Sequence, residues 1–278
     1  MSHQHESASS KAPSSSSFFD TSQWIKGAWY RALQPLVEKV TSITAINTLA
    51  ENSDSPGISA DEFSKELLAG LGVQWATKAV DLPKPDGRGT LVLANHPSGF
   101  IEGLVLMRIL HELSPDDSLL LANQFIAQKE QFSKHVLALD PFNSDGASRM
   151  NRNGLRQAAK CLRRGGVVGA FPAGRVSARR DAAGASLDQP WSMHFLRLAK
   201  ATNSHIVIAR MPWQSGLILR ALPVQIPALR ALFLSQEAFR HSQQPQEVIL
   251  TSAPDQLATD PQKATSELQK FCHGLHTA

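Results

Sequence analysis

Residues 91–103, LVLANHPSGFIEG, decide the fold of this chain. The first four residues form an uninterrupted apolar run, which predicts a buried strand. Asn95, His96, Pro97 and Gly99 then form a constrained turn. Beyond Glu102, apolar residues recur at helical spacing. A strand, a turn and a helix in this order are typical of an α/β sheet.

The rest of the chain repeats this alternation. Further strands are expected at residues 119–122, 136–139, 167–171, 205–209 and 248–251, and further helices at residues 154–164, 191–201 and 262–275. We therefore predict an α/β fold in which helices cover both faces of a mixed sheet, with the main domain spanning residues 60–278.

The N-terminal region differs in composition from the main domain. Residues 1–20 are rich in serine and predict a disordered tail, and residues 24–58 predict a helical segment. Apolar residues recur there at steps of three and four from Trp24 to Val40, with lysine and arginine among them. This pattern predicts an amphipathic helix, which either contacts a membrane surface or packs on the main domain.

Bulk properties exclude several classes of protein. The 278 residues carry a formal net charge of +4, which favours acidic partners such as phospholipid surfaces or CoA-like donors. A nucleic-acid module is not recognisable. The two cysteines, Cys161 and Cys272, give no CxxC spacing, and the histidines show no metal-ligand spacing, so no metal is expected. Neither a spanning apolar segment nor a secretory signal is predicted.

His96 and Glu102 are the candidate catalytic pair. A histidine has an unperturbed pKa near neutrality and can act as a general base, and an acid can fix its tautomer and stabilise the imidazolium. In an acyl transfer, His96 would take the proton of an acceptor hydroxyl, and the alkoxide would attack a thioester. The alternative is a structural histidine in a turn, with Glu102 placed at a helix start by the helix dipole.

Arginines supply candidate anion-binding groups. The segment Phe171 to Ser177, FPAGRVS, follows an apolar run directly, and Gly174 allows backbone N–H groups to face a ligand beside the planar fork of Arg175. Arg149 and Arg152 have helical spacing and form a second candidate anion site. The alternative for each is a solvated arginine, in a turn or on a helix face.

The three segments together resemble the motifs of the glycerolipid acyltransferase superfamily, the lysophosphatidate acyltransferase-like enzymes. The resemblance covers roughly residues 63–251 and is strongest to the branch of putative hemolysins and ornithine-lipid acyltransferases, which has an acidic residue six positions after the histidine, as Glu102 is here. Better-known members place an aspartate at the position of Ile101. Pro212 and the preceding strand are similar to the fourth motif, and Ala173 stands where many members have glutamate.

The resemblance implies a glycerol-3-phosphate acyltransferase-like fold with an apolar tunnel for the acyl chain, and an O-acyltransferase of phospholipid or related lipid metabolism. The co-substrate would be acyl-CoA or acyl-ACP, without a cofactor, and the acceptor a lysophospholipid or lyso-ornithine lipid. His96 would be the base and Glu102 its partner. Arg149, Arg152, Gly174 and Arg175 would serve binding, and Asn95, Pro97, Gly99, Phe171 and Pro172 would support the motifs.

The implied location is the cytoplasmic side of the cell membrane, with a peripheral contact. Three rivals remain open at the level of sequence: an inactive lipid-binding scaffold of the same fold, a basic membrane-surface protein whose helix at 24–40 is its main function, and a thioester hydrolase.

Overall fold

The structure is a computed structural model of the chain. It describes residues 17–21, 25, 28–127, 129–140, 146–177, 179–180, 186–222, 227–241 and 245–275. Trp24 and residues 1–16 of the predicted tail lie outside this part of the chain.

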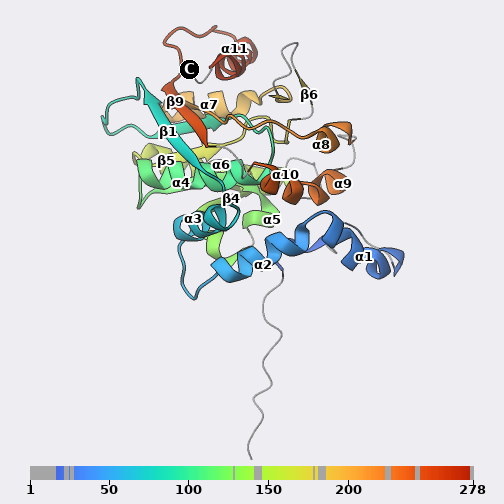
Figure 1. Ribbon diagram of the computed structural model, residues 1–278. Helices are drawn as coiled ribbons and strands as arrows, with labels where there is room; N and C mark the ends of the chain where they lie inside the picture. The colour runs from blue at the N-terminus through green and yellow to red at the C-terminus, as the bar shows by residue number, and fades with distance from the viewer. Residues whose placement is uncertain are drawn as a thin grey trace, which may run out of the picture.

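A seven-stranded mixed sheet forms the centre of the fold (Figure 1). Its order is β1 (Trp75–Val80), β9 (Gln246–Ser252), β8 (His205–Arg210), β2 (Thr90–Ala94), β5 (Val167–Ala170), β3 (Ser118–Asn123), β4 (Val136–Leu139). The strands from β8 to β4 are parallel to one another. β9 is antiparallel to β8, and β1 is parallel to β9, so the last two strands on this side of the sheet run in the opposite direction to the other five. A separate two-stranded ribbon pairs β6 (Arg179–Arg180) with β7 (Ser186–Leu187).

Helices cover both faces of the sheet, as the sequence predicts (Figure 1). One face carries α2 (Ile43–Ser53), α3 (Ala60–Gly70), α4 (Phe100–Leu113) and the short η2 (Glu130–Phe132). The other carries α6 (Ala147–Arg163), α7 (Met193–Thr202) and α11 (Pro261–Gly274). The remaining helices are α1 (Ala28–Val40), α5 (Gln124–Ala127), α8 (Leu217–Ala221), α9 (Pro227–Leu232) and α10 (Leu234–Arg240).

Side-chain alternation along the strands divides the interior into two cores. In β2, Val92 and Ala94 join the core under α4, whereas Leu91 and Leu93 join the core under α6 and α7. Successive strand residues point to opposite faces, and both faces are covered here, so the strand is apolar throughout. This explains why the run at residues 91–94 is continuous.

The predicted strands and helices of the main domain are confirmed, with differences at their ends. The largest concerns α6, which begins at Ala147, seven residues before the predicted start at Gly154. Polar residues and a glycine lower helix propensity there. Gly154 lies inside the helix because its missing side chain lets α6 approach β4, where an added Cβ would meet the carbonyl oxygen of Ala138 at 3.0 Å.

The N-terminal region contains two helices, α1 and α2, and Pro35 lies inside α1. The predicted tail is too long at its C-terminal end, because Phe18 and Phe19 are buried in the core. Phe18 packs against Phe63, Phe100 and Phe132, and aromatic burial of this kind holds the segment in place. Within the described residues, no helix has the length and apolar character needed to cross a bilayer.

Candidate active site

The candidate site lies at the carboxyl ends of β2 and β5. These neighbouring parallel strands are followed by connections to opposite faces of the sheet, with α4 after β2 and α7 on the way from β5 to β8. A crevice forms at the carboxyl ends of strands at such a topological switch point. His96 follows β2 by two residues, and Phe171 follows β5 directly, so both lie at this edge.

The His96 ring lies against Phe171. The two ring centroids are 4.1 Å apart, and the planes are inclined by 21°. The side chain of His96 retains 16% of its exposure, although its Nδ1 is buried. Phe171 therefore fixes the plane of the imidazole while part of the ring stays open to a substrate.

Glu102 faces the buried nitrogen of His96. It lies in the first turn of α4 and is fully buried, and its Oε2 is 3.9 Å from His96 Nδ1. This separation exceeds hydrogen-bond distance, and neither atom has a hydrogen-bond partner among the residues that the structure describes. The other carboxylate oxygen accepts hydrogen bonds from the backbone N–H of Ser98 at 2.6 Å and its hydroxyl at 2.7 Å. Ser98 thus aims one oxygen of Glu102 towards the imidazole.

Burial lowers the pKa of His96 below its ordinary value, and the negative charges of Glu102 and Asp188 oppose this shift. Desolvation disfavours the charged form of an imidazole, and it is the largest of these effects. Burial thus favours the neutral imidazole, which is the form that accepts a proton.

Side chains on both sides of the turn fix its backbone. The Asn95 amide donates to the carbonyl oxygen of Met211 at 3.0 Å and accepts from the N–H of Met211 at 2.7 Å. The carbonyl oxygen of Pro97 accepts a hydrogen bond from the hydroxyl of Ser215. The turn is thereby attached to the segment that follows β8.

Gly99 is required by the turn itself. Its φ is +107°, and an added Cβ would lie 2.7 Å from Leu234 Cδ2 and 3.0 Å from Val176 Cγ2. We expect Gly99→Ala to reduce the free energy of unfolding by about 1–3 kcal/mol, since a side chain is strained at this φ. Denaturant unfolding measures the change.

Gly103 provides the matched control for this substitution. It lies one turn further along α4, and an added Cβ there meets nothing within 4 Å. Gly103→Ala should raise stability by roughly 0.5–1 kcal/mol, because alanine is the better helix former. Equal effects of the two substitutions would contradict the role given to Gly99.

The predicted arginines lie on the surface of the protein. Arg149 and Arg152 are exposed on the first two turns of α6, and no hydrogen bond or ion pair within the described residues joins them to the His96 turn. Arg175 is exposed in the turn after β5, where Gly174 has a φ of +65°. Pro172 is buried, and its carbonyl oxygen accepts from the N–H of Ser192 at 2.9 Å. Arg175 is thus the predicted arginine nearest in sequence to residues that contact His96.

Three residues of the site are not predicted from the sequence. Asp188 and Ser177 bind the backbone of His96, and Arg230 donates to the carbonyl oxygen of Ser177 at 3.2 Å. Ser177 ends the FPAGRVS segment, and its place in that segment does not predict a contact with His96. Asp188 stands in a DQPW stretch that matches no motif, and only an isolated acid beside an apolar helix start could have drawn attention to it.

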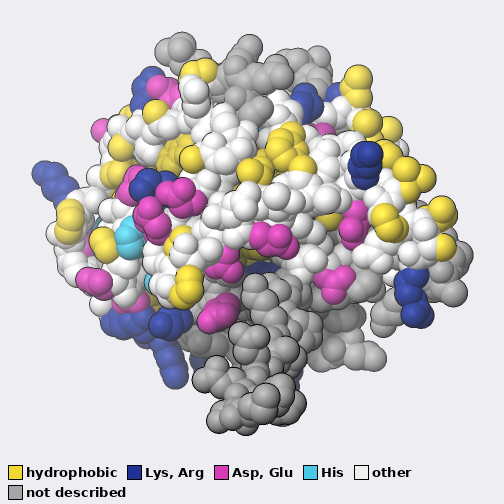
Figure 2. Space-filling view, turned by 60° about the horizontal axis from the view of Figure 1, so that its bottom comes forward, with side chains coloured by type: hydrophobic (Ala, Val, Ile, Leu, Met, Phe, Trp, Pro, Cys, Tyr) yellow, Lys and Arg dark blue, Asp and Glu magenta, His cyan; other side chains and the backbone are white. Residues whose placement is uncertain are grey.

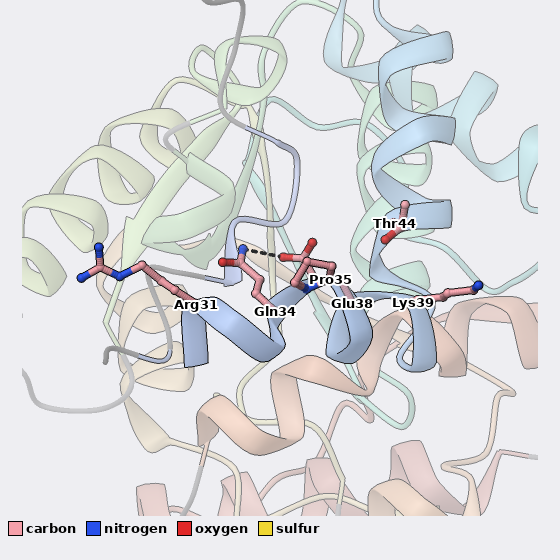
Figure 3. Close-up of a pocket in the computed structure, with 6 residues that line it drawn as sticks. All are labelled: Arg31, Gln34, Pro35, Glu38, Lys39 and Thr44. Atoms are coloured by element: carbon pink, nitrogen blue, oxygen red, sulfur yellow. Dashed lines mark hydrogen bonds between the residues drawn. The ribbon is translucent and has the colours of Figure 1, made fainter. Parts of the chain in front are cut away.

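A large surface cavity lies outside this site. It has a volume of about 550 Å³ and is lined by Arg31, Gln34, Pro35, Glu38, Lys39 and Thr44 (Figure 3). Gln34 donates to Glu38 at 2.8 Å in its middle, whereas Arg31 and Lys39 point away from it at either end (Figure 3). Oε1 of Glu38 also accepts a hydrogen bond from the hydroxyl of Thr21.

Comparisons with known proteins leave the family open. No family model matches the chain. No curated protein matches it either. Among solved structures, it is similar to the crystal structure of the 1-acyl-sn-glycerophosphate (LPA) acyltransferase PlsC from Thermotoga maritima, with a TM-score of 0.43 and 13% sequence identity over 88% of this chain and 90% of that chain.

Proposed function

We propose that this protein is an O-acyltransferase that moves a fatty acyl group from a thioester to a lipid hydroxyl. One observation carries the proposal: a partly exposed imidazole has its buried nitrogen facing a fully buried carboxylate. With Nδ1 directed at Glu102, Nε2 is the nitrogen left to accept a proton. A base held in one tautomer by an acid is the arrangement that activates a hydroxyl.

The proposed reaction conserves protons. His96 Nε2 takes the proton of the acceptor hydroxyl as its oxygen attacks the thioester carbonyl carbon. The C–O bond forms, the tetrahedral intermediate collapses, and the C–S bond breaks. The imidazolium then returns its proton to the leaving thiolate. Glu102 stabilises the imidazolium between these steps, and the 3.9 Å contact to Nδ1 is expected to shorten when that charge develops.

The donor and the acceptor are proposed from motif resemblance and charge. We propose acyl-ACP or acyl-CoA as donor, and a lysophospholipid or lyso-ornithine lipid as acceptor, in keeping with the hemolysin-like and ornithine-lipid branch. A net charge of +4 and exposed Arg149, Arg152 and Arg175 favour such acidic substrates. No cofactor or metal ion takes part in the proposed step.

An acyl-transfer assay tests this function. The purified protein is incubated with labelled acyl-ACP or acyl-CoA and a panel of lysolipids, and mass spectrometry identifies the products. An acylated lysolipid is the expected product. Release of free fatty acid with every acceptor would indicate a thioester hydrolase instead, and lipid binding without any turnover would indicate an inactive scaffold.

Exposed apolar side chains favour a peripheral contact with the membrane that holds the acceptor. Leu33, Leu36 and Val40 are exposed on α1, and Leu217 and Ile218 are exposed on α8. Hydrophobic and basic side chains occur together on the right-hand side of Figure 2, the side on which α1, α8 and α9 lie in Figure 1. Apolar side chains among basic ones are typical of an interfacial surface.

Leu36→Ser tests this contact, because Leu36 is 61% exposed on α1. Removing one inserted leucine is expected to lower the partition coefficient on anionic liposomes roughly tenfold, as a buried leucine contributes about 1.5–3 kcal/mol. Co-sedimentation with the liposomes measures it.

The matched control for Leu36→Ser is Leu113→Ser, at the far end of α4 from the His96 turn. Leu113 is also exposed, and its substitution is expected to leave liposome binding unchanged. An equal loss in the two variants, or no loss in either, would refute a membrane surface on α1.

A further inference from the structure

Asp188 is a buried carboxylate that the proposed catalytic step does not use. It lies between β7 and α7 with 5% of its surface exposed. Its Oδ1 accepts the backbone N–H of His96 at 3.1 Å and the hydroxyl of Ser177, and its Oδ2 accepts the indole N–H of Trp191 at 2.8 Å. A carboxylate removed from water is costly unless such donors surround it.

Ser177 closes a clamp around the backbone of His96. Its N–H donates to the carbonyl oxygen of His96 at 2.8 Å, while its hydroxyl lies between that oxygen and Asp188. Both backbone polar groups of His96 are therefore held by residues that follow β5 in the chain, whereas Glu102 acts on the side chain from α4. The clamp therefore fixes the position of the backbone that carries the imidazole.

We propose that Asp188 is a positioning residue for His96, which fixes its backbone through the clamp with Ser177 and stabilises its protonated form by charge. This inference rests on the proposed function for its catalytic consequence, since the imidazolium exists only while His96 holds the acceptor proton. The hydrogen bonds to the His96 backbone, and the effect of the Asp188 charge on the ring, do not depend on the proposed function.

The second role, the stabilisation of protonated His96, depends on the charges around its ring. Glu102 on α4 and the nearby Asp188 both raise the pKa of His96, while burial lowers it. Two other ionisable groups interact with Asp188. His273 on α11 accepts a hydrogen bond from the backbone N–H of Asp188 at 3.5 Å. The charges of Asp188 and Arg210 both affect the pKa of the Cys272 thiol. Removing the Asp188 charge therefore lowers the pKa of His96 further, because burial is then opposed by Glu102 alone among these carboxylates.

Asp188→Asn is the decisive variant, because it keeps an oxygen acceptor and removes the charge. We expect kcat to fall roughly tenfold with little change in KM, since hydrogen bonds to charged groups are the stronger ones. The acidic limb of the pH profile of kcat/KM, which reports the free base, should move to lower pH. NMR titration of the His96 ring should show the same direction of shift without any substrate.

Two further variants separate the roles. Ser177→Ala keeps the charge and loses the hydroxyl, so it should lower kcat without moving the acidic limb. Asp255→Asn removes an exposed carboxylate elsewhere and should change neither quantity. If Asp188→Asn does not fold, an unchanged kcat in Ser177→Ala overturns the role of the Ser177 hydroxyl in the clamp, which is the part that this variant removes.

Identical His96 titrations in Asp188→Asn and the wild-type protein would overturn the electrostatic role. A shift of equal size in Asp255→Asn would do the same. If the wild-type protein transfers no acyl group but the shift occurs, the proposed function fails and the charge effect on His96 stands. If acyl transfer occurs without the shift, the function stands and the charge effect fails.

Discussion

His96→Ala is expected to reduce acyl transfer by about two to four orders of magnitude, the usual contribution of a positioned general base. The ring is partly exposed and packs on Phe171 at 4.1 Å, so its removal leaves the elements of the sheet in place. The loss should fall mainly on kcat, because the base acts in the transition state while the lipid and thioester bind elsewhere. Product formation from labelled thioester measures it.

His194→Ala is the control for this experiment. His194 is exposed on α7, and its substitution should leave turnover unchanged. Acyl transfer by His96→Ala at the wild-type rate would refute the assignment of the base. The hydrolase alternative predicts the same loss in His96→Ala, so only the identity of the product separates it from acyl transfer.

Glu102→Gln is expected to be nearly as damaging, with a loss of roughly 10²- to 10⁴-fold in kcat. The amide oxygen can keep the hydrogen bonds from Ser98, which places the amide NH₂ towards His96 Nδ1. An NH₂ donor favours the tautomer in which Nδ1 is unprotonated and Nε2 carries the hydrogen. The nitrogen that should accept the substrate proton is then blocked, although the shape of the site is kept.

Glu112→Gln is the matched control, since Glu112 lies on the same helix and is 53% exposed. It should leave kcat unchanged. Glu102→Asp adds a second check, because it keeps the charge and shortens the reach, so part of the activity should survive. Full activity in Glu102→Gln would show that Glu102 is a helix-start residue without a role in tautomer choice.

Local patterns predicted most of the fold, because each buried strand had to be apolar on both faces. Residues 91–94 and 136–139 show this directly. The pairing of His96 with Glu102 was also accessible, since a strand, a turn and a helix start place them on neighbouring elements. What could not be predicted is how close they come, because the 3.9 Å separation depends on Ser98 and on the burial of α4.

The missed elements have a common cause: their partners are distant in sequence. Phe18 and Phe19 follow a serine-rich stretch and lack any periodic pattern, yet three phenylalanines from α3, α4 and η2 make a site for Phe18. Asp188 has no motif because its function depends on β5 lying beside β2. Arg149 and Arg152, predicted from helical spacing, are indeed on a helix, but spacing cannot tell an exposed face from one that lines a site.

The clamp on His96 also bears on the order in which the molecule is made. His96 and Glu102 are synthesised six residues apart, but the hydroxyl that binds the His96 carbonyl follows 81 residues later and the carboxylate that binds its N–H follows 92 residues later. A nascent chain that has not yet reached Asp188 thus carries the whole catalytic motif without the support that orients it. Under the proposed function, full turnover is therefore expected only after β5 has inserted between β2 and β3 and Asp188 has been synthesised.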